Sequence, residues 1–189
     1  NLGLVAMELD DLPAAERHHL RSLELYERLG AVNGTAREST NAAVTYLAQG
    51  RLDDALAAAR RGVATTRELD YRLHLAYALS ALAAVERARA RHDEAARLER
   101  EALALSRETG DKSAEVEALI GLATAEAALG RRVAAQAALD EALAVAELTG
   151  SAGKRAEALV VQAELWAAAG KRAAAAQLLH GLTADAGVP

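Results

Sequence analysis

Several residue types are missing from this sequence or scarce in it. Its 189 residues include no cysteine, no phenylalanine and only two prolines, and aromatic residues make up 3%. Without cysteine the chain can form neither disulfides nor thiolate metal sites. Few prolines leave long segments free to be helical, while a core with so few aromatic side chains must be built by close approach of backbones. These absences disfavour a single large globular core and favour helices packed closely together.

Positive charge is also in short supply. The 22 Lys and Arg residues face 27 Asp and Glu residues, which gives a net charge of −5. This balance argues against direct binding of nucleic acid. No apolar run of about 18 residues lacks a charge or a turn, so we expect no membrane span. The N-terminus carries no signal peptide and begins at Asn1 rather than Met, so we expect a cytoplasmic piece of a longer protein.

A period of 40 residues runs through the whole chain. Alanine recurs at five positions with this spacing, and turn-forming residues, mostly glycine, recur every 20 residues. The alanines are Ala15, Ala55, Ala95, Ala135 and Ala175, and the turn residues are Asp10, Gly30, Gly50, Asp70, Ala90, Gly110, Gly130, Gly150 and Gly170. A fixed period is the signature of stacked repeats, and alanine at repeated positions lets neighbouring helices approach closely.

The segments between these turns have the apolar spacing of helices. In residues 73–89 the apolar stripe is Leu75, Leu79, Leu82 and Val85, at the steps of three and four residues typical of an amphipathic helix. Carboxylates such as Asp53 and Asp93 fall at predicted helix starts, where they meet free N–H groups. We predict helices over 1–9, 12–29, 33–49, 53–69, 73–89, 93–109, 113–129, 133–149, 153–169 and 173–183.

The predicted fold class is therefore all-α, an α-solenoid of about five antiparallel helix pairs. We expect one array over residues 1–189, with repeats at about 1–30, 31–70, 71–110, 111–150 and 151–189.

The predicted first helices carry a pattern known from one repeat family. The matching residues are Leu2-Gly3, Leu82-Ala83, Leu122-Ala123 and, at the start of a second helix, Gly50-Arg51-Leu52 with Ala55. The chain resembles the tetratricopeptide repeat family over essentially its whole length. Its period is 40 rather than 34 residues, and the proline near the end of the second helix is missing. Turns such as residues 107–114 are similar to those in large bacterial transcriptional regulators.

The resemblance implies a right-handed superhelix whose first helices line a concave groove for a protein or peptide. It implies a non-catalytic binding module without cofactors, the sensor or docking arm of a bacterial regulatory protein. Carried over by repeat position, the groove-lining candidates are Asn1, Arg37, Asn41, Tyr77, Arg87, Glu117, Thr124, Glu157 and Glu164.

Residues 149–156, TGSAGKRA, raise the alternative of a phosphate-binding loop. Such a loop needs a glycine five residues before Gly153, where Leu148 stands, and a hydroxyl where Arg155 stands. We therefore interpret this stretch as a turn between two helices.

Other functions have less support in the sequence. The five histidines lack the spacing of a helical zinc motif, and no nucleophile, base and orienting group can be combined into a catalytic site. We therefore expect neither a metal site nor an enzyme. A structural role stays open as an alternative to partner binding, because residues 173–183 form an apolar last helix without a polar cap. Such an open end could join two copies into a homodimer.

Overall fold

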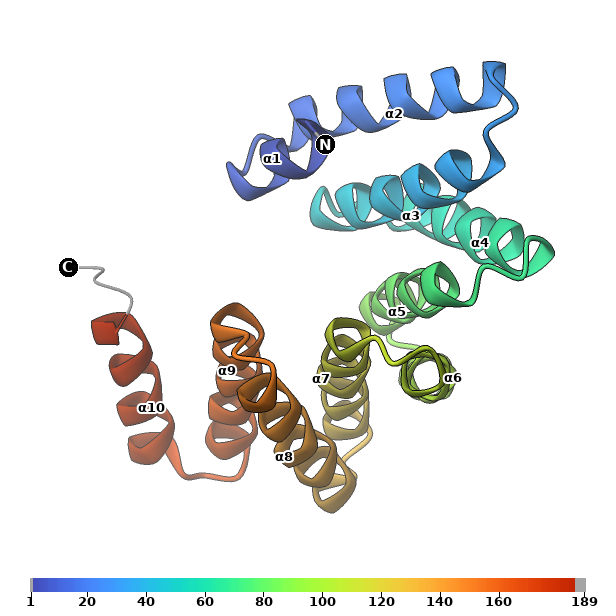
Figure 1. Cartoon of the computed structure of the whole chain (residues 1–189). Coiled ribbons are helices and arrows are strands. Elements are labelled where there is room, and N and C mark those ends of the chain that lie inside the picture. The colour runs from blue at the N-terminus through green and yellow to red at the C-terminus, as the bar shows by residue number, and fades with distance from the viewer. Residues whose placement is uncertain (1, 186–189) are drawn as a thin grey trace.

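The computed structural model describes residues 2–185, with side chains as far as Leu182. These residues form ten α-helices and no strand, wound into a crescent (Figure 1). The helices are α1 (Leu2–Glu8), α2 (Leu12–Arg28), α3 (Val32–Ala48), α4 (Leu52–Glu68), α5 (Arg72–Ala88), α6 (His92–Thr109), α7 (Lys112–Ala128), α8 (Arg132–Leu148), α9 (Ala152–Ala168) and α10 (Arg172–Asp185). The predicted all-α solenoid is confirmed, and the helix ends lie within about two residues of their predicted positions.

Every turn between helices uses the same backbone device. All nine predicted turn positions have a left-handed backbone, with φ between 47° and 81°. At Gly50 the Arg51 N–H donates to the Tyr46 carbonyl, and the Gly50 N–H donates to the Leu47 carbonyl, both at 2.9 Å. This pair of bonds is a Schellman motif, which satisfies the free carbonyls at a helix end. The repeated motif ends each helix after a fixed length and so sets the period of the array.

The five alanines spaced by 40 residues lie at helix contacts. Ala15, Ala55, Ala95 and Ala135 have no exposed surface, and Ala175 is 5% exposed. A longer side chain at these positions would have to displace a neighbouring helix. The expected close packing at these alanines is confirmed.

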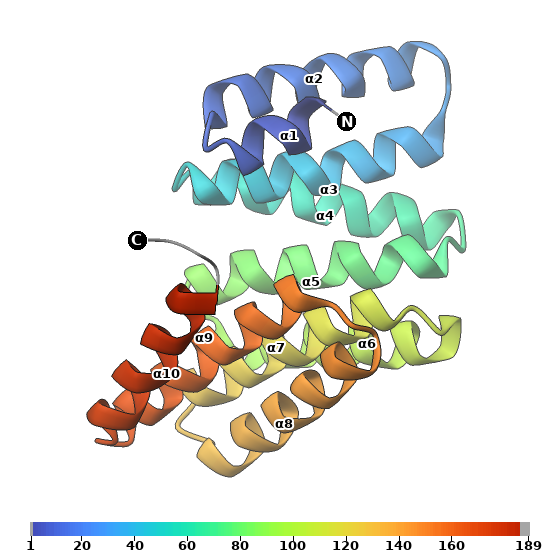
Figure 2. The same ribbon diagram turned by 60° about the vertical axis from the view of Figure 1, so that its left-hand side comes forward.

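The odd-numbered helices form the inner layer of the crescent. From α3 to α9, each odd-numbered helix packs against the next odd-numbered helix as well as against its two neighbours in sequence. No comparable contact joins successive even-numbered helices in the described part of the chain. The array therefore curves towards its odd-numbered helices, and α3, α5, α7 and α9 carry its concave inner face (Figures 1 and 2).

The helix starts differ from the expectation in one respect. Asp53 lies in the first turn of α4, where the helix dipole favours it, but the capping residue is Arg51 and no side chain caps the backbone there. The side chains that do accept backbone N–H groups belong to Asp11 and Asp111, at 2.9 to 3.1 Å. Asp93 is likewise not a cap, because Arg91 is the capping residue of α6; Asp93 lies in the first turn and pairs with Arg131 at 2.8 Å.

Candidate functional site

One residue from each of four inner helices occupies the same position in the 40-residue period. Arg37, Tyr77, Glu117 and Glu157 are spaced by 40 residues and lie on α3, α5, α7 and α9. The Arg37 side chain is 48% exposed and those of Glu117 and Glu157 are 37% and 51% exposed. We call these four residues the inner row. Its composition changes along the array, from a base through an aromatic ring to two acids.

An aromatic cluster surrounds the middle of the inner row, at the start of α5. The Tyr71 and His74 rings are stacked with centroids 4.3 Å apart, and the Tyr77 ring meets His74 edge-on at 6.4 Å. The Tyr77 hydroxyl donates to Asp111 Oδ2 on the next inner helix at 3.0 Å. Burial raises the pKa of Tyr77, so its hydroxyl stays protonated and available for this bond.

His74 is the titratable member of this cluster. Burial, together with the positive charge of Arg37, lowers its pKa. Its Nδ1 atom is buried without a hydrogen-bond partner in the described structure. At neutral pH the ring is therefore uncharged and offers an unused polar atom beside the two tyrosines. Arg37 itself donates to the Tyr26 hydroxyl at 3.0 Å.

The acidic part of the inner row is bridged by one lysine. Lys154 Nζ lies 3.4 Å from Glu117 Oε2 and 3.1 Å from Glu157 Oε2. Burial works against its charge, but the two glutamates hold the pKa of Lys154 above its ordinary value. Lys154 belongs to the suspected phosphate loop, yet it lies within α9, and Thr149 to Ser151 form the turn before that helix.

Thr124 and Glu164 come together at the other end of the same two helices. Both line a cavity of about 320 Å³ between α7 and α9, near the turn into α8. The Thr124 hydroxyl donates to the Ile120 carbonyl of its own helix at 2.9 Å, whereas the Glu164 carboxylate is exposed.

Arg87 lies deeper than a groove-lining residue would. Its side chain is 28% exposed, and its Nη1 atom lies 3.8 Å from Oε1 of the enclosed Glu99. Burial raises the pKa of Glu99 to about 8. The Ser80 hydroxyl, which donates to the Glu99 carboxylate at 2.8 Å, acts in the opposite direction but is outweighed. A Cβ atom at Gly121 would lie only 2.0 Å from the Glu99 carboxylate. Gly121 therefore leaves the room that the carboxyl group occupies.

The structure thus divides the nine sequence candidates into groups. It brings together Glu117 with Glu157 and Thr124 with Glu164, and it places Asn41 half-buried on α3. Asn1 lies outside the described residues. Sequence reasoning missed His74, Lys154 and Glu99. The sequence held one signal for them. His74 and Lys154 share a repeat position with the small residues Gly34 and Ala114, and Glu99 is equivalent to the apolar Leu139.

Two further features bear on the kind of site. The described residues include no group of three or more His, Asp or Glu side chains placed to hold a metal ion. None of the described helices is both long and apolar enough to cross a membrane.

Comparison with known proteins identifies the repeat. Two tetratricopeptide repeat models match the sequence, one over residues 1–68 and one over residues 75–109. No curated protein is significantly similar to the chain in sequence.

Several solved structures share the architecture. A protein from Podosopora anserina, described as a putative kinesin light chain with nearly identical TPR-like repeats, superposes with a TM-score of 0.68 at 19% identity, covering 97% of this chain and 90% of that one. A Rap protein complexed with Competence and Sporulation Factor gives 0.86 at 14% identity, covering 98% of this chain and 52% of that one.

The apo form of RapI gives a TM-score of 0.70 at 13% identity, covering 96% of this chain and 50% of that one. The chain thus spans about half the length of each Rap structure, and at these identities the likeness shows the fold alone. The sequence matches and the repeat geometry agree, and the chain belongs to the tetratricopeptide repeat family.

Proposed function

We propose that this chain is a non-catalytic module that binds a protein or peptide segment along its concave inner face. The observation that supports the proposal is the inner row, a polar or aromatic side chain at the same repeat position of four inner helices that pack side by side. A partner lying across that row would contact successive repeats in turn.

The chemistry of the inner face supports this role. Tyrosine and arginine dominate the energetic centres of protein interfaces, because they combine a large contact area with polar tips. The whole chain has four tyrosines and one tryptophan, and Tyr71 and Tyr77 lie together with His74 beside Arg37. The Rap protein crystallised with Competence and Sporulation Factor has the same fold, which supports a peptide or protein as the partner.

The wider context is part of the same proposal. We infer a cytoplasmic sensor or docking arm of a bacterial regulatory protein, which needs no cofactor and does not itself contact nucleic acid. The net charge of −5 supports the last point, because a nucleic-acid-binding surface is strongly positive.

Charge reversal on the inner face tests the proposal. We would select binders from a display library of random short peptides, then measure their affinity for Arg37→Glu and Glu157→Lys. Both side chains are about half exposed, so we expect an intact fold and a loss of affinity of about tenfold or more. Glu147→Lys, an exposed residue on outer helix α8, is the matched control. Equal affinity of all three variants would contradict binding on the inner face.

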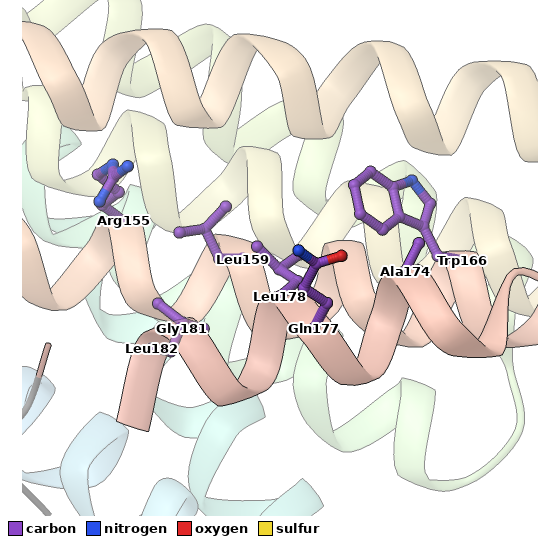
Figure 3. Close-up of a pocket in the computed structure, with 8 residues that line it drawn as sticks. All are labelled: Arg155, Leu159, Trp166, Ala174, Gln177, Leu178, Gly181 and Leu182. Carbon is purple, nitrogen blue, oxygen red and sulfur yellow. The ribbon is translucent and has the colours of Figure 1, made fainter. Parts of the chain in front are cut away.

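Self-association through the end of the array is a second candidate function. The observation that favours it is an apolar cavity of about 520 Å³ on α9 and α10, lined by residues that include Leu159, Trp166, Leu178 and Leu182 (Figure 3). Leu179 is 41% exposed, whereas Leu139, its equivalent one repeat earlier, is fully buried in the apolar core. A second copy covering this face would form a homodimer.

Light scattering over a series of protein concentrations tests this second candidate. We expect the average mass to rise with concentration for the wild type, and to stay at the monomer value for Leu179→Glu. Val133→Glu, which is 86% exposed on α8, should behave as the wild type. A monomer at every concentration would rule out the homodimer.

A further inference from the structure

The cavity between α7 and α9 results from one small residue. Ala127 lines it, and positions 7, 47 and 87 are its equivalents in the three preceding repeats. Met7, Leu47 and Arg87 occupy those positions. Each of them is far larger than alanine, so residue 127 is the first in this series that leaves its space empty.

The larger residues fill the matching gap between successive inner helices. The Thr45 hydroxyl of α3 donates a hydrogen bond to Met7 Sδ of α1 at 3.0 Å. Leu165, in the wall of the cavity, is the residue equivalent to Thr45. Leu47 packs against the apolar core. Arg87 of α5 buries its Nη1 atom beside Glu99, whose carboxylate lies against Gly121 of α7. Alanine at position 127 does not fill the space that a larger side chain would occupy, and a cavity of about 320 Å³ remains there.

The walls of this cavity are apolar and its mouth is charged. Val161 and Leu165 are half-buried in the wall, while Glu164 and Arg132 are exposed beside it. Neither charged side chain forms an ion pair or a hydrogen bond with another described residue. By contrast, the acids of the inner row are already bridged by Lys154.

The surrounding charge favours a cation at the mouth. The cavity lies at the C-terminal ends of α7 and α9, where the helix dipoles place partial negative charge. Glu164 is the acid at the mouth itself, whereas Glu117 and Glu157 lie towards the other end of the two helices with Lys154 between them. Arg132 on α8 offsets only part of this negative charge.

We propose that this cavity is the anchor site for the partner, and that it takes a leucine- or methionine-sized side chain next to a lysine or arginine that pairs with Glu164. The partner thus supplies the apolar side chain that positions 7 and 47 supply from within the protein. The volume is close to the lower limit of about 300 Å³ for pockets that bind small molecules, which suits one or two side chains of a peptide. This inference rests on the proposed binding of a peptide by the inner face.

Filling the cavity from within is the direct test. Ala127→Leu restores the size found at Leu47 without removing any polar group, and the probes are peptides selected from the random display library on the wild-type chain. We expect an apolar residue next to a basic one among the selected peptides, and an affinity for Ala127→Leu lower by about tenfold or more, as expected for losing one buried aliphatic side chain. Ala167→Leu, the same change at the next equivalent position, is exposed and outside the cavity, so it should leave the affinity unchanged.

A charge exchange tests the second half of the proposal. Glu164→Lys should weaken the selected peptides, and replacing the basic residue of the peptide by glutamate should restore affinity for this variant alone. A melting temperature of Ala127→Leu at or above that of the wild type would show that the loss of binding is not a loss of fold.

The outcomes separate this inference from the proposed function. Peptides that lose affinity for Arg37→Glu or Glu157→Lys but bind Ala127→Leu like the wild type would overturn the anchor site and leave inner-face binding intact. Selected peptides that are indifferent to every one of these variants would overturn both.

Discussion

Two of the enclosed carboxyl groups lie in different repeats and are held in different ways. Glu38 on α3 and Glu99 on α6 are 1% and 2% exposed. His19 Nδ1 lies 2.8 Å from Glu38 Oε2, and both side chains are enclosed. Glu99 has the Ser80 hydroxyl at 2.8 Å, and its nearest cation, Arg87, lies 3.8 Å away.

The difference appears in the pKa values. Burial disfavours the charge on Glu38, but the hydrogen bond and charge of His19 hold its pKa below the ordinary value. For Glu99 burial prevails and raises the pKa to about 8. At neutral pH Glu38 is thus ionised and Glu99 protonated, and the close histidine beside Glu38 contributes to this difference.

The same comparison shows what a repeat position determines. His19 and Glu99 are equivalent residues in the 40-residue period, and Ala59 and Leu139 are the other buried members of that series. One place in the fold therefore holds a base, an acid and two apolar side chains. The repeat determines where a side chain lies, whereas its neighbours determine its chemistry.

Breaking the His19–Glu38 pair should have the largest effect on stability. His19→Ala removes the partner that lies 2.8 Å from the enclosed Glu38 carboxylate, while Arg37 Nε stays 3.6 Å from it. Removing one partner of a buried pair costs up to about 3–5 kcal/mol. Urea denaturation followed by circular dichroism measures this loss at neutral pH.

A double variant sharpens that prediction. With His19→Ala and Glu38→Ala together no unpaired charge is left. The double variant should therefore lose less stability than the sum of the losses of the two single variants. A loss below about 1 kcal/mol for His19→Ala alone would contradict the pairing, because it would equal that of an ordinary substitution.

The second prediction concerns pH and has opposite signs for the two carboxyl groups. Between the ordinary pKa of 4.5 and about 8, native Glu99 keeps a proton that the unfolded chain has released. Its contribution to stability therefore falls as pH rises through this window, by up to about 1.4 kcal/mol per pH unit. The contribution of Glu38, whose pKa is lowered, is present above that ordinary value and is lost as the pH falls below it.

Glu99→Gln isolates the Glu99 contribution. The amide cannot ionise, so the free energy of unfolding of this variant, relative to the wild type, should increase steadily from pH about 5 to about 8. Urea denaturation at several pH values measures it. Parallel pH profiles for the two proteins would show that Glu99 is ionised in the native state.

The fold could be predicted because its determinants are local and repeated. Glycine at positions such as Gly50 and Gly130 ends each helix, and alanine at positions such as Ala55 marks each close contact. Both signals recur every 40 residues, so a chance occurrence at one site does not alter the prediction. The predicted helix starts lie within about two residues of the observed ones, but Asp53 falls in the first turn of α4 and not at its cap, where Arg51 lies.

The site could be predicted only in part. The inner row follows from the period alone, since Arg37 and Tyr77 are equivalent residues. The Glu99 environment could not be predicted, because Ser80, Arg87 and Gly121 come from two other helices and meet only in the folded array. Sequence shows that Ala127 is smaller than its equivalents, but only the structure shows that this position lies in the gap between α7 and α9.

The smallest effect concerns the turns, where two equivalent positions differ in one side chain. Ala90 and Gly130 have φ of 59° and 74°, and a Cβ atom at Gly130 would meet nothing within 4 Å. An exchange there changes only the backbone preference, which costs an L-residue about 1–2 kcal/mol in the left-handed region. Glycine also gains freedom in the unfolded chain, so Ala90→Gly should stabilise by about 0.5–1 kcal/mol net and Gly130→Ala should destabilise by a similar amount. In a chain of this size that corresponds to melting temperatures shifted by a few degrees in opposite directions. Shifts of the same sign would mean that contacts of the two turns, and not their backbone conformation, set the difference.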